Sequence, residues 1–250
     1  MGSFIRGGTI DMTTTNLTGR KALVVGANGG IGSAIAIALA GQGIDTALMG
    51  RNVEAVNAVA ETCRKSGAAA FPVICDISRI ETIEDAINEA IDKLDGLNYL
   101  VNCAGISAEG KLHETDLVGS EAILDTNLRA FLYLARYALP EINKQSGGAV
   151  VKIGAVNHPY SGVNTYLAAS QGGEGLAEAL FEDVREYGTR VCTIRPGWVN
   201  TPLVTADEGI DPALMIQPGD ISQTVLFVLS MAETACPTEI TILPQRSPYV

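Results

Sequence analysis

The sequence predicts a single α/β domain in which about seven parallel strands form a doubly wound sheet with helices on both faces. Short apolar segments rich in β-branched residues alternate with longer helical patterns along most of the 250 residues. The apolar fraction of 47% is enough to bury a large single core. Parallel strands joined by helices require right-handed crossovers, so the expected strand order is 3-2-1-4-5-6-7.

Seven segments have the length and composition of strands, and six patterns between or beside them have helical periodicity. The predicted strands are Ala22–Val25, Thr46–Met49, Ala70–Ile74, Tyr99–Asn102, Ala149–Ile153, Arg190–Ile194 and Glu239–Leu243. The predicted helices are Ile31–Ala40, Val53–Ser66, Ile80–Leu94, Gly119–Gln145, Thr165–Tyr187 and Ile221–Met231. Pro244 closes the last strand, which favours an edge position because proline donates no hydrogen bond to a ladder.

The two ends of this pattern are irregular. Residues 1–16 are rich in Gly and Thr, so we expect a flexible N-terminal tail before a domain that spans residues 17–250. Residues 200–219 follow a strand end and contain three prolines and two glycines. That composition predicts a mobile lid over a site at the carboxyl ends of the strands.

Composition excludes several classes of function. The net charge of −11 argues against a nucleic-acid partner, because no basic surface exists to bind phosphates. The five cysteines and two histidines are scattered, which does not favour a metal site or a disulfide framework. No apolar run reaches the roughly 18 residues of a membrane span, and no secretory signal precedes the domain. We expect a cytoplasmic protein that acts on a small molecule.

A glycine-rich turn is the strongest functional signal in the chain. The string Gly26-Ala27-Asn28-Gly29-Gly30-Ile31-Gly32 follows the first predicted strand and opens the first predicted helix. Glycines at these positions allow a tight turn, a close approach of backbone to pyrophosphate and close helix–sheet packing. The turn predicts a Rossmann-type dinucleotide site that includes Gly26, Asn28, Gly30, Ile31 and Gly32.

The end of the second strand indicates which dinucleotide binds. A cofactor with a free ribose 2′-hydroxyl is normally held by an acidic side chain here. Gly50 offers none, whereas the guanidinium of Arg51 can pair with a 2′-phosphate. The predicted cofactor is therefore NADP(H).

From Leu17 to Pro244, the chain resembles the classical short-chain dehydrogenase/reductase family. The resemblance rests on five segments, in order and correctly spaced: the glycine turn, Cys75-Asp76-Ile77, Asn102-Cys103-Ala104-Gly105, Asp125-Thr126-Asn127-Leu128 and Arg195-Pro196-Gly197-Trp198-Val199-Asn200-Thr201. It implies an oxidoreductase with a nicotinamide cofactor and a carbonyl or alcohol substrate. It also implies a homodimer or homotetramer.

The same resemblance assigns expected roles to individual residues. Asp76 would contact the adenine amino group, Thr201 would bond the nicotinamide carboxamide, and Asn127 falls on the active-site asparagine. Further expected cofactor contacts are Ile77, Asn102, Ala104, Gly105, Tyr166, Pro196, Gly197 and Val199. Counting back from Pro196 without gaps places Tyr166 on the family's catalytic tyrosine and Ser170 on its lysine, so the expected catalytic set is Tyr166, Asn127 and Ser170.

The chain departs from the family in its proton-transfer groups. Ser170 replaces the lysine, and Ala155, in Ile153-Gly154-Ala155, replaces a serine. A second register would place Leu167 on the tyrosine, and it loses the lysine as well. The segment from Ala155 to Tyr166 is also about two residues shorter than in the family.

Four residues are conceivable substitutes for the missing groups. They are Ser161, His158, Tyr160 and Lys152, each of which has a structural explanation that we prefer. Our leading hypothesis is a divergent NADP(H)-dependent oxidoreductase. The alternatives are a reductase scaffold that performs non-redox chemistry, such as an isomerisation or cyclisation, and a non-catalytic cofactor-binding subunit paired with an active homologue.

Overall fold

The computed structural model describes residues 15–108, 110–156, 161–202, 204 and 209–249. Within these residues, seven parallel strands form one sheet in the order β3-β2-β1-β4-β5-β6-β7, which confirms the predicted fold class and strand order. The strands are β1 (Lys21–Val25), β2 (Asp45–Gly50), β3 (Ala70–Ile74), β4 (Tyr99–Asn102), β5 (Ala149–Ile153), β6 (Arg190–Pro196) and β7 (Glu239–Ile242). β7 pairs only with β6 and lies at the predicted edge.

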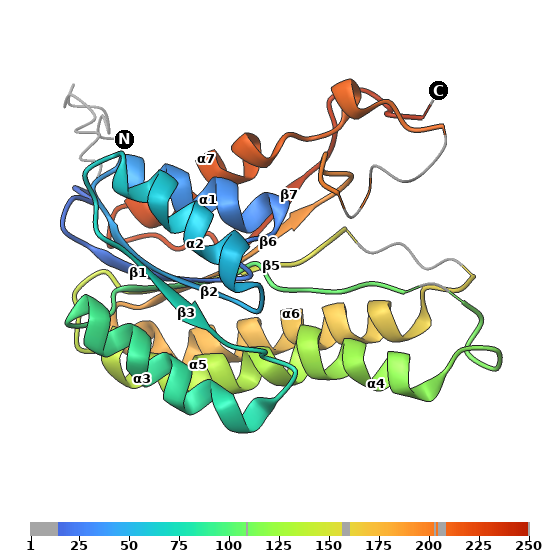
Figure 1. Ribbon diagram of the computed structural model, residues 1–250, viewed down its shortest axis with the longest axis horizontal. Coiled ribbons are helices and arrows are strands. Elements are labelled where there is room, and N and C mark those ends of the chain that lie inside the picture. The colour runs from blue at the N-terminus through green and yellow to red at the C-terminus, as the bar shows by residue number, and fades with distance from the viewer. Residues whose placement is uncertain (1–14, 109, 157–160, 203, 205–208, 250) are drawn as a thin grey trace, which may run out of the picture.

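Two helical layers cover the sheet (Figure 1). The helices α1 (Gly30–Gly41), α2 (Val53–Arg64) and α7 (Pro218–Ser230) pack on one face. The helices α3 (Ile83–Leu94), α5 (Ala130–Ile142) and α6 (Asn164–Val184) pack on the other, and α4 (Leu117–Leu124) precedes α5. Each face buries its own apolar cluster, because neighbouring residues of a strand point to opposite sides. Among the described residues, no helix is long and apolar enough to cross a membrane.

One predicted helix is divided in the structure. The pattern at Gly119–Gln145 is not a single helix, because a π-helical turn at Asp125–Arg129 separates α4 from α5. A π turn inserts one residue and redirects the side chains around it. Asn127 lies in this turn and points back to the loop after β4. The periodicity of the sequence does not reveal the insertion, because the flanking turns are ordinary α-helix.

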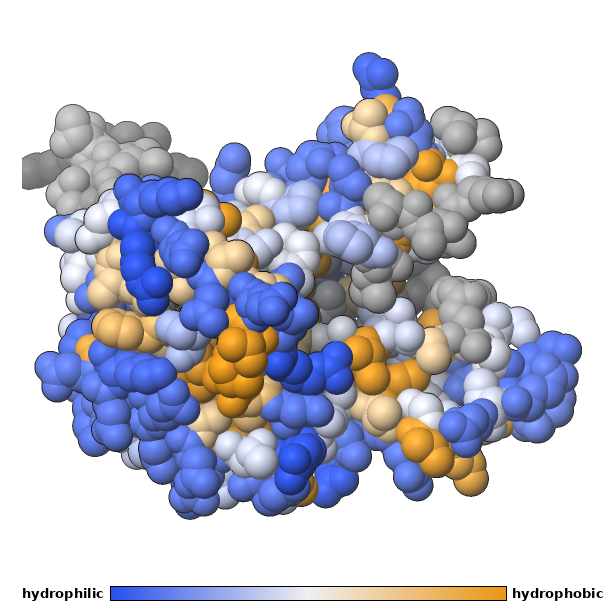
Figure 2. All heavy atoms as spheres, viewed as in Figure 1, coloured by the Kyte–Doolittle hydropathy of each residue, from blue (hydrophilic) through white to orange (hydrophobic). Residues whose placement is uncertain are grey.

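The order of the strands reverses between β1 and β4, so the loops after these strands separate and leave a crevice. The space-filling view shows the surface hollowed on this side, between the part that carries α4 and the part that carries the C-terminal residues (Figure 2). The fold therefore places the glycine turn and the segments after β4, β5 and β6 around one depression.

Tyr249 pairs with the segment that follows β6. Tyr249 forms an antiparallel bridge with Ile210, and its hydroxyl accepts a hydrogen bond of 2.8 Å from Nε1 of Trp198. The two rings meet edge to face, with centroids 6.1 Å apart. Of the predicted lid, the structure describes 200–202, 204 and 209–219, which include a short turn at Pro212–Leu214. Residues 203 and 205–208, like residues 1–14 of the predicted tail, lie outside the described residues.

Asp95, which ends α3, allows a test of the backbone geometry. Its φ of +54° lies in the left-handed region, and its side chain is fully exposed beside Lys21. Asp95→Gly and Asp95→Ala both remove the carboxylate, but only glycine adopts this conformation without a Cβ clash. We expect the glycine variant to be more stable than the alanine variant by about 0.5–1 kcal/mol in urea unfolding. Equal stabilities would show that this φ is not maintained in solution.

Candidate active site

The turn between β1 and α1 is built from positions that have no room for a side chain. Gly26 has a φ of +76°, and a Cβ on it would lie 2.9 Å from the backbone nitrogen of Ala104. A Cβ on Gly32 would lie 2.2 Å from the carbonyl oxygen of Gly26. A Cβ on Gly30 would lie 2.8 Å from Cγ2 of Thr201, in the segment after β6. The glycine pattern is thus a steric requirement, and it brings the turn against the segments after β4 and β6.

The N-terminus of α1 is available to an anion. Its N-cap, Gly29, has no side chain to cap the helix, and the first turn carries no acidic residue. The first backbone N–H groups of a helix have no partner within the helix, and they carry a partial positive charge. The turn therefore offers N–H donors and a favourable dipole to an anion such as a phosphate.

A pocket of about 290 Å³ extends from this turn across the ends of β2, β3 and β4. Seven of the predicted cofactor residues line it, namely Gly26, Asn28, Arg51, Asp76, Ile77, Ala104 and Gly105. Sequence reasoning did not select nine others: Val25, Gly29, Met49, Gly50, Asn52, Cys75, Cys103, Ile106 and Thr126. Most of these are direct neighbours of predicted residues at strand ends, so their positions in the sequence were a usable signal.

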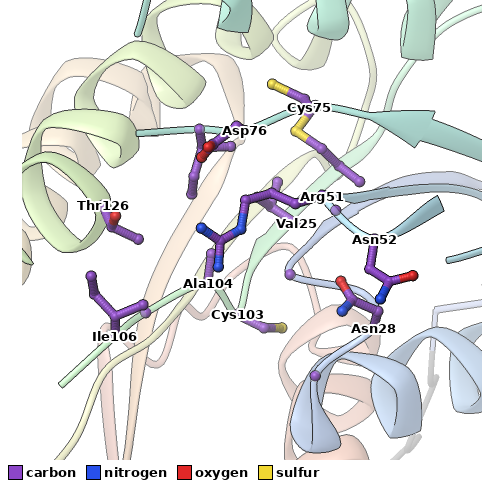
Figure 3. A pocket seen from close by; sticks show the side chains of 16 residues that line it. Val25, Asn28, Arg51, Asn52, Cys75, Asp76, Cys103, Ala104, Ile106 and Thr126 are labelled. Atoms are coloured by element: carbon purple, nitrogen blue, oxygen red, sulfur yellow. The ribbon is translucent and has the colours of Figure 1, made fainter. Parts of the chain in front are cut away.

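The end of β2 forms one wall of the pocket. The guanidinium of Arg51 points into the pocket between Asp76 and Ala104 (Figure 3). A Cβ on Gly50 would lie 2.3 Å from Oδ1 of Asn28 and 2.8 Å from Cγ2 of Val56. A side chain at position 50 is therefore excluded by Asn28 and Val56, and Arg51 supplies a positive charge to this wall.

Asp76 forms the opposite wall of the pocket. Its Oδ1 accepts hydrogen bonds from the backbone nitrogen of Ser78 at 3.2 Å and from its hydroxyl at 2.8 Å. These bonds fix the carboxyl beside Ile77, where an adenine amino group could donate to it. Burial raises the pKa of Cys103, which also lines the pocket, to about 12.

Asn127 connects the π turn to the loop that borders the pocket. Its Oδ1 accepts from the backbone nitrogen of Ile106 at 2.9 Å, and its Nδ2 donates to the carbonyl oxygen of Ile106 at 2.8 Å. Asn102 supports the same loop from below, since its buried side chain accepts from the nitrogen of Ala104. In this structure, both asparagine side chains shape the backbone around the pocket, and Asn102 does not line it.

Four further predicted cofactor residues lie in the segment that continues from β6, whereas Gly30, Ile31 and Gly32 lie in the first turn of α1. Pro196 ends the strand, Gly197 packs against Pro244, and Val199 is buried and paired with Ile216. Thr201 is buried and touches Gly30, as described above. The segment therefore forms the side of the depression that lies opposite α6.

Tyr166 and Ser170 lie one turn apart on α6. Burial raises the pKa of the Tyr166 phenol, the hydrogen bond from Ser170 lowers it, and the Glu174 carboxylate raises it. Ser170 is buried, while Tyr166 is only partly covered. The structure thus pairs the two residues on which the first register places the tyrosine and the lysine.

The residues near Tyr166 and Ser170 do not supply all the proton-transfer groups of the family. Ala155 follows β5 and supplies no hydroxyl, although the backbone still pairs with β6 through Val156. Of the conceivable substitutes, Ser161 is exposed and Lys152 is buried within β5. His158 and Tyr160 lie outside the described residues.

Comparisons with known proteins agree with this geometry. Residues 20–209 match the family model for short chain dehydrogenases. An uncharacterized oxidoreductase of Staphylococcus aureus strain USA300 is 29% identical over 232 residues, which are 92% of this chain and 99% of the relative.

Two solved structures are similar over almost their whole length. A dehydrogenase/reductase from Sinorhizobium meliloti 1021 has a TM-score of 0.85 and 30% identity, and the match covers 93% of this chain and 97% of that one. A short chain dehydrogenase from Burkholderia cenocepacia J2315, solved in complex with NADP, has a TM-score of 0.85 and 27% identity, with 92% and 98% coverage.

Asn127→Ala tests whether this side chain maintains the pocket. The change removes two hydrogen bonds and leaves two polar groups of Ile106 without them, which should cost about 2–3 kcal/mol of unfolding free energy. We also expect weaker NADPH binding in calorimetry, because the loop lines the pocket. Asn143→Ala is a suitable control, since it removes a hydrogen bond that Thr189 donates between the end of α5 and the start of β6, outside the pocket. An unchanged NADPH affinity in Asn127→Ala would contradict the assigned role.

Proposed function

This chain belongs to the short chain dehydrogenase family, and we propose that it is an NADP(H)-dependent oxidoreductase that interconverts a carbonyl and an alcohol. The observation that carries the proposal is the glycine turn, which lets the N-terminus of α1 begin without a side-chain cap beside a pocket that Arg51 enters.

The residues present fit an NADP(H) cofactor. The turn and the α1 N-terminus would hold the pyrophosphate, Arg51 the 2′-phosphate, Asp76 the adenine, and Thr201 the carboxamide. The NADP in the Burkholderia relative supports the same assignment. When bound, this cofactor supplies hydride to a carbonyl carbon or accepts it from an alcohol carbon.

The chain's own residues would handle the proton. In the reduction direction, Tyr166 donates its phenolic proton to the substrate oxygen, and Ser170 stabilises the resulting phenolate by its hydrogen bond. Asn127 keeps the loop after β4 in place, and we propose that residues 200–219 close over the substrate.

The missing groups set a limit on the rate. Ala155 cannot donate a hydrogen bond to the substrate oxygen, and loss of one such donor commonly lowers the rate on the order of 10²–10³-fold. Ser170 carries no charge that would lower the pKa of Tyr166. We therefore expect slow turnover compared with an enzyme that has both groups.

Self-association is part of the proposal. Leu117 and Val118 on α4 are 68% and 71% exposed, and Leu132 on α5 is 48% exposed. Apolar side chains of this size gain by burial against a second copy, so we propose a homodimer or homotetramer that uses these helices.

The first test is turnover. Purified protein incubated with NADPH and a panel of aldehydes and ketones should consume NADPH, followed by its absorbance at 340 nm. Tyr166→Phe should lower the rate by at least about 10²-fold at saturating NADPH, because the proton donor is lost. NADPH binding without turnover on any substrate would favour non-redox chemistry or a non-catalytic subunit instead.

The second test concerns the choice of cofactor. Arg51→Ala should weaken NADPH binding about 10–100-fold, which corresponds to the loss of a charge-assisted contact of roughly 1.5–3 kcal/mol. NADH affinity should stay the same, because NADH has no 2′-phosphate. Arg79→Ala, an exposed arginine that does not line the pocket, serves as the control. Equal losses for both cofactors would show that Arg51 does not read the 2′-phosphate.

A further inference from the structure

Lys152 is a buried lysine on a strand that is otherwise apolar. It is 4% exposed, and it lies on the face of β5 that α5 and α6 cover. Its Nζ lies 5.8 Å from the ring centroid of Phe131 on α5. Burial of a lysine is costly unless nearby groups compensate it, so its presence there requires an explanation.

Helix α6 has a space that accommodates this side chain. A Cβ on Gly173 would lie 2.5 Å from Cε and 3.3 Å from Nζ of Lys152. The same point is 3.4 Å from the backbone carbonyl oxygen of Asn127, in the π turn. Any larger residue at position 173 would displace the lysine, so the ammonium group is held between β5, α6 and the π turn.

The ammonium group lies one turn of α6 beyond the Tyr166–Ser170 pair. Ser170 and Gly173 are three residues apart on the helix, and side chains at this spacing are neighbours, with about 5–6 Å between Cβ positions. Ser170 is buried, and its side chain lowers the pKa of Tyr166 one turn before it. Tyr166, Ser170 and the position that the Lys152 ammonium group approaches at Gly173 therefore follow one another along α6.

Charged groups from three other elements face the same space. Glu174 on α6 is close to Arg195 on β6, with 3.6 Å between Oε1 and Nε, and Arg195 contacts Glu239 on β7 at 2.8 Å. Burial lowers the pKa of Lys152, and the Glu174 carboxylate raises it. Burial likewise raises the pKa of Glu174, while Arg195 and Lys152 lower it and Glu239 and Glu178 raise it. A lysine in this environment releases its proton more readily than a surface lysine.

We propose that Lys152 is the basic group that restores the proton of Tyr166, through the hydroxyl of Ser170, in place of the lysine that α6 lacks. The inference rests on the proposed function. During reduction, hydride adds to the carbonyl carbon, and the substrate oxygen takes the proton of Tyr166. The proton of Ser170 then passes to the phenolate oxygen, and an ammonium proton of Lys152 passes to Ser170. Water finally reprotonates the neutral amine, so each turnover consumes one hydride and one proton.

Lys152→Met tests the relay, because methionine has a similar length and no proton to give. Glu174 keeps Arg195 as a counter-ion, so the fold should be maintained. With the full chain and NADPH, we expect kcat for carbonyl reduction to fall on the order of 10²-fold and the fall of kcat at alkaline pH to disappear. NADPH affinity should change less than twofold. Lys144→Met, which changes an exposed lysine beyond α5, should have no effect.

A lysine introduced on α6 should restore part of the activity that Lys152→Met loses. Lys152→Met combined with Ser170→Lys places an ammonium group beside Tyr166, and at least tenfold recovery of kcat over Lys152→Met would support the relay. A purely structural lysine would not be replaced in this way. A folded Lys152→Met enzyme with wild-type kcat and pH profile would overturn the proposal.

Two measurements cover the remaining cases. If Lys152→Met does not fold, Glu174→Gln should shift the alkaline fall of kcat to lower pH, because it removes a carboxylate that raises the pKa of Lys152. An unchanged pH profile in Glu174→Gln would overturn the relay.

If the wild type reduces no carbonyl, the titration of Tyr166 can be followed by the tyrosinate absorbance of the NADP⁺ complex, after subtraction of the absorbance of Tyr166→Phe. Its midpoint should rise in Lys152→Met, and an unchanged midpoint would overturn the proposal independently of the failure of turnover.

Discussion

The site depends on the close contact between the first turn and the loop after β4. Gly26 lies against the backbone of Ala104, and Gly32 lies against the carbonyl oxygen of Gly26, at separations that leave no space for a methyl group. This contact lets α1 begin directly above the sheet with its first N–H groups free. Without it, the loops that bring Arg51, Asp76 and Ala104 together would not share one pocket.

The π turn also determines the contacts of Asn127, whose side chain and backbone carbonyl face different elements of the site. The side chain of Asn127 holds Ile106 by two hydrogen bonds, while its backbone carbonyl faces α6 near Gly173. A regular helix from Gly119 onward would turn these groups to other directions. The π turn therefore lies between the loop at the pocket and the part of α6 that Lys152 approaches.

The sequence predicted the sheet well, because strands that are buried on both faces give continuous apolar segments with little ambiguity. β3, β4 and β5 have the predicted ends, and the glycine turn lies where the motif placed it. The π turn was missed, since Asp125–Arg129 contains residues that an α-helix also accepts. The burial of Lys152 was equally hidden, because it depends on an absent side chain at Gly173 on a distant helix. Strand and turn signals are local, whereas both of these features arise from tertiary packing.

The pairing of Tyr249 with Ile210 and Trp198 has a practical consequence for work on the purified protein. Tyr249 is part of the wall beside the depression, so a label or fused segment attached close to this residue would stand next to the depression and disturb that wall. Kinetic results from such a variant would include the effect of this disturbance.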